Sequence, residues 1–276
     1  MEPVLQVENL GVQLKNKKEL RTIVENVNFS VCQGECLGIL GESGSGKSMT
    51  VKAVLGLLEN NFFINGSALF EGKNLIGENK EVLRSLRGSR ATMVLQNPMV
   101  CFDPLYRIYK QMEETFLVHT NWSKKEIKEK SLSIVEQMKL ENGEEVLNKY
   151  PHQLSGGMLQ RIMIGIAIAL KPKLLIADEP TTAIDAITQV EILEEFRNIK
   201  NNHQTAMIFI SHDLGAISRV ADRILVMNQG KIVDEGDLEH ILYHSTDTYT
   251  KLLVEKRSAM MERYHTCVHA KEAARV

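Results

Sequence analysis

A glycine-rich run that ends in lysine and serine is the first part of this sequence that points to chemistry. It reads Gly41-Glu42-Ser43-Gly44-Ser45-Gly46-Lys47-Ser48 and fits the pattern G-x-x-x-x-G-K-[ST] completely. Glycines let the backbone turn its N–H groups toward phosphate oxygens, and the helix that follows adds its positive dipole end. A glycine-rich turn with a chance Lys-Ser is the alternative. We interpret the run, together with Met49, as a cradle for a nucleoside triphosphate in which Lys47 bridges the β- and γ-phosphates and Ser48 ligates Mg²⁺.

Two carboxylates follow an apolar segment later in the chain. Leu174 to Ala177 have the pattern of a buried strand, and Asp178 and Glu179 come directly after it. The carboxyl end of a parallel strand lies at the ligand-binding edge of its sheet. We therefore expect Asp178 to hold Mg²⁺ and Glu179 to orient, or take a proton from, an attacking water. A simple turn before Pro180 is the alternative, but it does not explain the apolar residues that precede it.

The elements that must position these residues are predicted from hydrophobic patterning. Residues 4–14 and 23–31 alternate between apolar and polar, which is typical of two half-buried antiparallel strands, and Cys36 to Leu40 are apolar throughout, as in a buried strand. Strand patterns return at 173–177, 205–210 and 224–227, with helical patterns between them, which indicates right-handed parallel crossovers. The predicted fold is α/β, with an antiparallel β-subdomain on the nucleotide-binding core.

A stretch without strand patterns separates the two parts of this core. Its residues 123–141 have the apolar spacing of an amphipathic helix, whose charges we interpret as a solvated face. We predict three parts: a core at 1–96 and 166–236, a helical insert at 97–165, and a C-terminal helix with a mobile tail at 237–276.

The composition limits the class of protein. The chain has 276 residues, 43% hydrophobic and 25% charged, and its 33 basic and 35 acidic residues give a net charge of −2. This balance argues against nucleic acid as a partner. A secretory leader and an apolar run long enough to span a membrane are both lacking, and we expect the four cysteines to be reduced thiols. Attachment to a membrane protein stays open.

Four further motifs complete a pattern with a family resemblance. Leu154-Ser155-Gly156-Gly157 precedes a helix that Ser155 could simply cap, Gln96 follows a strand, Thr182-Ala183-Ile184-Asp185 follows the acidic pair, and His212 ends another strand. In this order, over about residues 4–250, the chain resembles the ATP-binding cassette (ABC) ATPases of membrane transporters. The resemblance implies a P-loop NTPase (RecA-like) core with an inserted α-helical subdomain.

The resemblance also implies roles for single residues. Gln96 would sense Mg²⁺ or the water, and His212 would contact the γ-phosphate and couple to Glu179. Ser155, Gly156 and Gly157 would bind the nucleotide held by a partner cassette, with Asp185 at the interface between the two. The catalytic set expected in this way is Lys47, Gln96, Glu179 and His212, and the metal set is Ser48, Gln96 and Asp178. ATP would join two subunits, and hydrolysis would release them.

Two positions depart from the family pattern. The aromatic residue that usually stacks on adenine is Leu14 here, so the contacts of the base are open. The family's signature is Leu154-Ser155-Gly156-Gly157 here, and the glutamine that usually follows it is Met158, a variation that looks like the peptide and nickel import branch.

The segment after Gln96 resembles one branch of the family. Gln96-Asn97-Pro98, followed by Phe102-Asp103-Pro104, looks like the oligopeptide, dipeptide and nickel importers, and is closest to subunits that import nickel or metal–metallophore complexes. This implies a heterodimer with a second, homologous ATPase, two permease subunits, an extracytoplasmic solute-binding protein, and a place at the cytoplasmic face of the cell membrane. A permease helix could dock on the apolar residues nearby, or these could be core residues of the insert: Met99, Phe102, Leu105, Tyr106 and Ile108.

Other functions remain as alternatives. They are ABC ATPases for another substrate, exporters, non-transport cassettes that act on nucleic acid or ribosomes, and a module that binds ATP without hydrolysing it. The intact Glu179 and His212 argue against the last. The tail residues His265, Cys267 and His269 could bind a metal, although an unstructured tail is the favoured interpretation.

Overall fold

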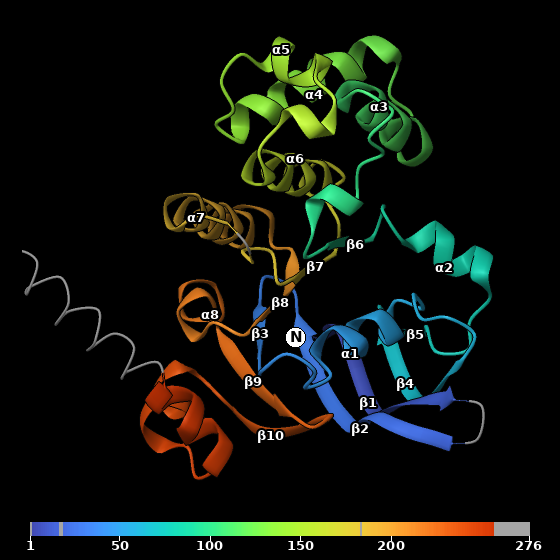
Figure 1. The fold of residues 1–276 in the computed structure, drawn as a ribbon. Helices are drawn as coiled ribbons and strands as arrows, with labels where there is room; N and C mark the ends of the chain where they lie inside the picture. Colours follow the sequence, from blue (N-terminus) through green and yellow to red (C-terminus); the bar gives the residue numbers. More distant parts are fainter. Residues whose placement is uncertain (1, 17–18, 183, 257–276) are drawn as a thin grey trace, which may run out of the picture.

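Two β-sheets and a layer of helices make up the protein (Figure 1). The computed structural model describes residues 2–16, 19–182 and 184–256. The tail residues His265, Cys267 and His269 lie outside this range. Within the described ranges, no helix combines the length and apolarity that crossing a membrane requires.

The first sheet is antiparallel and carries the N-terminal strands. Its order is β2-β1-β4-β5, formed by β1 (Pro3–Asn16), β2 (Glu19–Cys32), β4 (Phe62–Phe70) and β5 (Lys73–Asn74). The β1–β2 hairpin confirms the predicted antiparallel pair, and alternation buries Val7 and Phe29, which lie opposite each other. The sequence patterns did not predict β4 and β5, which extend the sheet on the far side of β1.

The second sheet is mostly parallel, and its strands β3 and β7 end at the glycine-rich loop and at the acidic pair. Its order is β10-β9-β3-β8-β7-β6, and only β10 runs antiparallel to its neighbour; the strands are β3 (Cys36–Leu40), β6 (Ala91–Val94), β7 (Leu174–Asp178), β8 (Ala206–Ser211), β9 (Arg223–Asn228) and β10 (Lys231–Gly236). Strand β3 is buried along its whole length between β8 and β9. Leu40 pairs with Ser211 and Asp178 with Ile210, so the segments that follow these strands leave the sheet at one edge.

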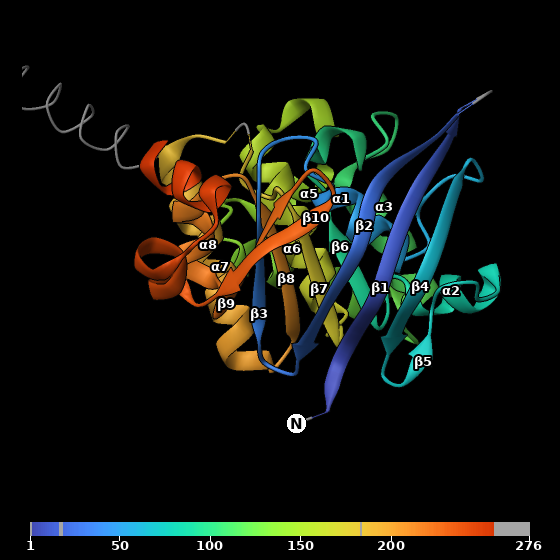
Figure 2. The same ribbon diagram turned by 90° about the horizontal axis from the view of Figure 1, so that it is seen from below.

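Helix α1 (Lys47–Val54) lies between the two sheets (Figures 1 and 2). Its Val51 and Val54 are buried in one hydrophobic core with Leu5 and Val24 of the first sheet and Ile39 of the second. At about 25 cal/mol per Å² of apolar surface, this burial stabilises the helix and both sheets together. The glycine-rich loop therefore connects a strand and a helix that are both held by the core.

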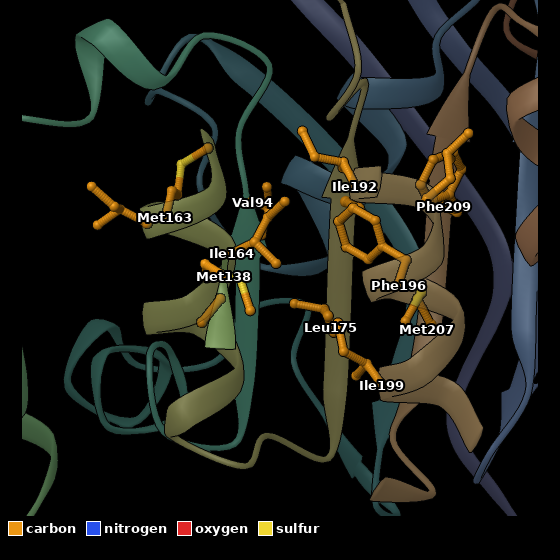
Figure 3. Packing of buried hydrophobic residues seen from close by; sticks show 14 of the residues in the cluster. Val94, Met138, Met163, Ile164, Leu175, Ile192, Phe196, Ile199, Met207 and Phe209 are labelled. Carbon is orange, nitrogen blue, oxygen red and sulfur yellow. The ribbon is translucent and has the colours of Figure 1, made fainter. Parts of the chain in front are cut away.

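Helices cover the other face of the parallel sheet, with α3, α4 and α5 forming an outer layer (Figure 1). Helix α2 (Lys80–Leu86) is not part of this layer: it lies beside β5, and its Leu83 is buried in the same core as α1 (Figures 1 and 2). The longer helices of the layer are α3 (Ile108–His119), α4 (Lys124–Gln137), α6 (Gly156–Ala169) and α7 (Ala186–His203); shorter ones are α5 (Gly143–Asn148), α8 (Leu214–Val220), η1 (Pro98–Val100), η2 (Pro151–Gln153) and η3 (His240–His244). Figure 3 shows their core, in which Phe196 of α7 meets Phe209 of β8 edge-on at 5.4 Å.

Two expected helices have different limits in the structure. Helix α4 starts close to the predicted residue 123, at a capping box between Ser123 and Glu126, but ends at Gln137 because Lys139 adopts a left-handed conformation with φ 55°. The helix expected near residue 240 is a π-helical turn, and residues 248–256 form a second helix that the patterns did not predict.

The structure differs from two other expectations. The predicted boundary of the insert at residue 165 falls inside α6, which runs unbroken to Ala169. Of the apolar residues proposed to face a permease, Phe102 and Ile108 are buried, whereas Met99, Leu105 and Tyr106 are exposed. For the first two the core interpretation is therefore the correct one, because both belong to the hydrophobic core of the helical layer.

Candidate active site

The glycine-rich run forms a tight loop between β3 and α1. Gly46, which precedes the helix, has a φ of 106°, a conformation that favours glycine, and a Cβ there would lie 3.3 Å from the Ile23 carbonyl oxygen. A Cβ on Gly41 would lie 2.4 Å from the carbonyl oxygen of Met227. The buried Ser45 hydroxyl has no hydrogen-bond partner among the described residues. The loop is therefore close-packed at Gly41 and Gly46, exposed at Gly44, and carries one buried hydroxyl without a partner in the described part of the chain.

Lys47 is buried at the centre of this loop. Its Nζ donates hydrogen bonds to the carbonyl oxygens of Gly41, at 2.7 Å, and Glu42, at 2.9 Å, and lies 3.7 Å from Glu179 Oε1. Burial lowers the pKa of Lys47, and the neighbouring Glu179 carboxylate opposes that shift. An ammonium held in this way is placed to exchange carbonyl oxygens for those of a phosphate.

Ser48 and Asp178 meet across the edge of the sheet. The Ser48 hydroxyl donates a hydrogen bond of 2.6 Å to Asp178 Oδ1. Burial raises the pKa of Asp178, and the hydrogen bond from Ser48 opposes the shift. Hydroxyl and carboxylate oxygens are the hard donors that Mg²⁺ prefers, so this pair suits the metal expected here.

Glu179 is the point on which the other polar side chains converge. Its Oε2 accepts hydrogen bonds from Gln96 Nε2 at 2.9 Å and from the Thr182 hydroxyl at 3.0 Å, and His212 Nδ1 lies 3.4 Å away. Its backbone is left-handed, with φ 47°, and its N–H donates to the Ile210 carbonyl oxygen. One carboxylate is thereby fixed beside the loop. The sequence patterns gave roles to Gln96 and His212, whereas Thr182 appeared only as the first residue of a motif, without a role; the signal for its contact is a hydroxyl three residues after the carboxylate.

The signature residues lie elsewhere in the chain, next to the start of α7. The Ser155 hydroxyl accepts the Met158 N–H at 3.2 Å, which caps α6. A Cβ on Gly157 would lie 2.9 Å from Thr188 Cγ2, and the N–H of Thr188 donates to Asp185 Oδ1. Of the hydrogen bonds that lower the pKa of Asp185, the one from the Thr188 N–H has the largest effect.

These signature residues form a polar face that is open to solvent. Ser155, Gly156 and Asp185 are exposed, and a Cβ on Gly156 would meet no heavy atom within 4 Å. In the part of the chain that the structure describes, no hydrogen bond or ion pair joins this face to the loop at 41–48.

The expected base contact is still open. Leu14 is half-buried, and the residue directly opposite it on β4 is Phe62.

Comparisons with known sequences give the same picture as the motifs. Residues 24–182 match the family model described as ABC transporter. A metal-staphylopine import system ATP-binding protein of Staphylococcus aureus is 43% identical over 242 residues, which cover 88% of this chain and 89% of the relative. An oligopeptide transport ATP-binding protein of Haemophilus influenzae is 40% identical over 250 residues, which cover 91% of this chain and 77% of the relative.

Solved structures agree at the level of the fold. A dimeric bacterial ABC transporter cassette superposes with a TM-score of 0.76 at 25% identity, covering 85% of this chain and 98% of the cassette. The same cassette in a post-hydrolysis dimer with ADP and phosphate gives a TM-score of 0.77 at 24% identity, with the same coverage. The family match, the two relatives and this fold together show that the chain belongs to the ABC transporter family, as an ATP-hydrolysing subunit of an importer.

Proposed function

We propose that this chain hydrolyses MgATP at an interface between two cassettes, with Glu179 as the group that activates water. The observation that carries the proposal is the convergence of Gln96, Thr182 and His212 on one carboxylate beside Lys47. A carboxylate held by donors at fixed distances is preorganised to orient a water molecule for in-line attack on the γ-phosphate. Lys47 then offsets the negative charge of the phosphates.

The metal in this proposal is Mg²⁺, held by Ser48 and Asp178, with Gln96 close by. Their oxygen donors support that choice. When bound, the ion would neutralise charge on the β- and γ-phosphates. The chain's own part is to keep Ser48 and Asp178 together and to hold Glu179 for the water.

We propose that two cassettes are needed, because the exposed N-terminus of α6, with Ser155 and Gly156, offers N–H groups and a hydroxyl to an anion, and no carboxylate among the described residues forms a hydrogen bond with it. We propose that it closes over the triphosphate bound by a homologous second ATPase, with Asp185 at the interface. ATP then acts as a ligand that stabilises the dimer and is removed by hydrolysis.

A groove between the sheet and the helical layer supports docking on a membrane permease. It has a volume of about 570 Å³, and its lining is mostly apolar; the lining includes Leu57, Thr92, Phe102, Tyr106, Met163 and Leu170. Tyr106 is also half exposed, so it offers a ring to an incoming helix. We propose two permease subunits, one for each cassette, which place the chain at the cytoplasmic face of the cell membrane.

The substrate class follows from the relatives. Their names describe import of metal–staphylopine and transport of oligopeptides. We propose that the assembled transporter takes up nickel, another metal–metallophore complex or small peptides, delivered by an extracytoplasmic solute-binding protein.

Phosphate release tests the catalytic part of the proposal. The purified chain, with its second ATPase where that is needed, is expected to release phosphate from ATP only when Mg²⁺ is present. Lys47→Ala is expected to abolish ATP binding, whereas Lys130→Ala, at an exposed lysine on α4, is the control. Binding that survives in Lys47→Ala would remove the phosphate site from the proposal.

The substrate class is tested in the assembled transporter. Its ATPase rate is measured with solute-binding protein loaded with nickel alone, a nickel–metallophore complex or a short peptide. Stimulation by one of these supports the import of that class. A rate that responds to none of them would contradict the proposed substrates while leaving the ATPase activity intact.

A further inference from the structure

The C-terminal helix at residues 248–256 makes two direct contacts to the phosphate loop. The N–H of Glu42 donates a hydrogen bond of 3.0 Å to the Tyr249 hydroxyl oxygen, and Lys256 Nζ lies 2.9 Å from Glu42 Oε1. These pairs are 207 and 214 positions apart in the sequence. A part of the chain outside the matched family segment thus holds the second residue of the glycine-rich motif.

The helix is itself fixed to the body of the protein. Asp247 caps it, because its Oδ1 accepts the N–H of Thr250 at 2.8 Å and the Thr250 hydroxyl at 3.1 Å, and Thr250 is fully buried. Tyr249, Leu253 and Val254 pack against the core that lies under the helices. The Tyr249 hydroxyl is therefore held at a fixed place and does not belong to a loose tail.

Glu42 joins this helix to Lys47 through a single residue. Its N–H points to Tyr249, while its carbonyl oxygen accepts Lys47 Nζ at 2.9 Å and the Ser45 N–H at 3.2 Å. The N–H of Glu42 thus bonds to a side chain outside the loop, and the carbonyl oxygen of the same residue accepts a hydrogen bond from the Lys47 ammonium. A shift of Tyr249 would move the resting place of Lys47.

We propose that Tyr249 and Lys256 are positioning residues for ATP, which hold the front of the phosphate loop in its binding-ready form. The inference rests on the proposed nucleotide site at 41–48. Of the two contacts, the hydrogen bond to Tyr249 carries most of the effect. Both ends of the Lys256–Glu42 ion pair are more than half exposed, where water and salt weaken it.

The expected effect is a change in ATP affinity with little change in the chemical step. Tyr249→Phe removes the acceptor and leaves the Glu42 N–H without its partner, so the Michaelis constant for ATP should rise about three- to tenfold while kcat stays near that of the parent. Tyr243→Phe makes the same chemical change at an exposed tyrosine nearby, and should leave both constants unchanged.

Lys256 supplies an independent arm of the test. Lys256→Met should raise the Michaelis constant less than Tyr249→Phe does, and Lys256→Glu should raise it further, because two carboxylates then face each other. High salt should remove these differences, and Lys256→Arg should restore the parent value. Lys251→Met, an exposed lysine on the same helix, is the matched control. If Tyr249→Phe lowers the thermal midpoint of the nucleotide-free chain, its effect on the Michaelis constant is set aside. The Lys256 variants and their Lys251→Met control then test the proposal by themselves.

Coupling between the loop and the helix also works in the other direction. Because linkage is reciprocal, saturation with a non-hydrolysable ATP analogue should slow hydrogen exchange at the amides of residues 248–256, and Tyr249→Phe should abolish that protection. A purely structural helix would exchange at the same rate with and without nucleotide.

The failures of the two proposals are distinguishable. If Lys47→Ala abolishes binding but Tyr249→Phe and Lys256→Glu have the ATP constants of their controls, the positioning inference is wrong and the nucleotide site stands. A fall in kcat at an unchanged Michaelis constant would also overturn the inference. If Lys47→Ala binds ATP normally, the nucleotide site itself is wrong.

Discussion

Gln96 and Glu179 are joined by a hydrogen bond of 2.9 Å although they lie 83 positions apart in the sequence. The register of two neighbouring strands explains the contact. Val94 of β6 pairs with Ala177 of β7 in parallel, and each of the bonded residues comes two positions later in its own strand's continuation. The chain enters the helical layer directly after Gln96, where η1 starts at Pro98. We therefore expect a movement of this layer to reach Glu179 through the Gln96 side chain.

Replacing Glu179 with glutamine should separate binding from hydrolysis. Glutamine keeps the shape and can still accept the hydrogen bonds from Gln96 and Thr182, but it does not take a proton from water. Phosphate release should fall by about 10²-fold or more, while ATP binding persists and dimers accumulate on size exclusion with MgATP. The control is Glu194→Gln, an exposed glutamate on α7. Rapid turnover in Glu179→Gln would contradict the role of this carboxylate.

Thr182 gives a finer test of how Glu179 is held. Thr182→Val keeps the shape of the side chain but removes the hydroxyl that donates to Glu179 Oε2 at 3.0 Å. The carboxylate then loses one of its restraints, so kcat should fall roughly tenfold with ATP affinity unchanged, and Thr182→Ser should recover most of the loss. Steady-state kinetics of the three proteins measure this. Equal kcat values for Thr182→Val and the parent would leave Thr182 without a part in catalysis.

The sequence predicted the site better than its surroundings, for physical reasons. Glycines, a buried strand and paired carboxylates each have a local cause, so the loop at 41–48 and the strand before Asp178 were evident. Strand β10 is half polar and lies at the edge of the sheet, where burial imposes little pattern, and it was missed.

Long-range contacts account for the remaining omissions. The hydrogen bond between Tyr249 and Glu42 depends on how the C-terminal helix packs, and no spacing in the sequence encodes it. Phe102 and Ile108 have the same apolar character as the exposed Leu105, so only the fold could separate core from surface.

Asp234 should make the C-terminal segment sensitive to pH. Burial alone would raise its pKa, but hydrogen bonds from Ser245 and His240 outweigh burial and hold the pKa below the ordinary value. A depressed carboxyl pKa adds stability above the pKa of the unfolded state, about 3.9, and this is lost as the pH falls through the folded value. Asp234→Asn should therefore lower the free energy of unfolding by about 1–3 kcal/mol at neutral pH.

The same variant should converge with the parent in acid. Urea unfolding at neutral pH and at successively lower pH measures the gap, with Glu255→Gln, an exposed acid further along the segment, as the control. A gap that stays constant as the pH falls would show that the carboxylate charge at Asp234 contributes nothing to stability.

The groove beside the helical layer leads to a prediction about assembly. Tyr106 lines the groove and is half exposed, so Tyr106→Asp places a charge where an apolar permease helix is proposed to lie. The isolated chain should keep its ATP affinity, because Tyr106 has no contact with the phosphate loop among the described residues. Co-purification with co-expressed permeases should fall at least tenfold, since one unpaired buried charge costs several kcal/mol.

Val118→Asp, an equally drastic change at an exposed residue on α3 outside the groove lining, should leave co-purification unchanged. Equal recovery of permeases by both variants would move the docking surface away from this groove.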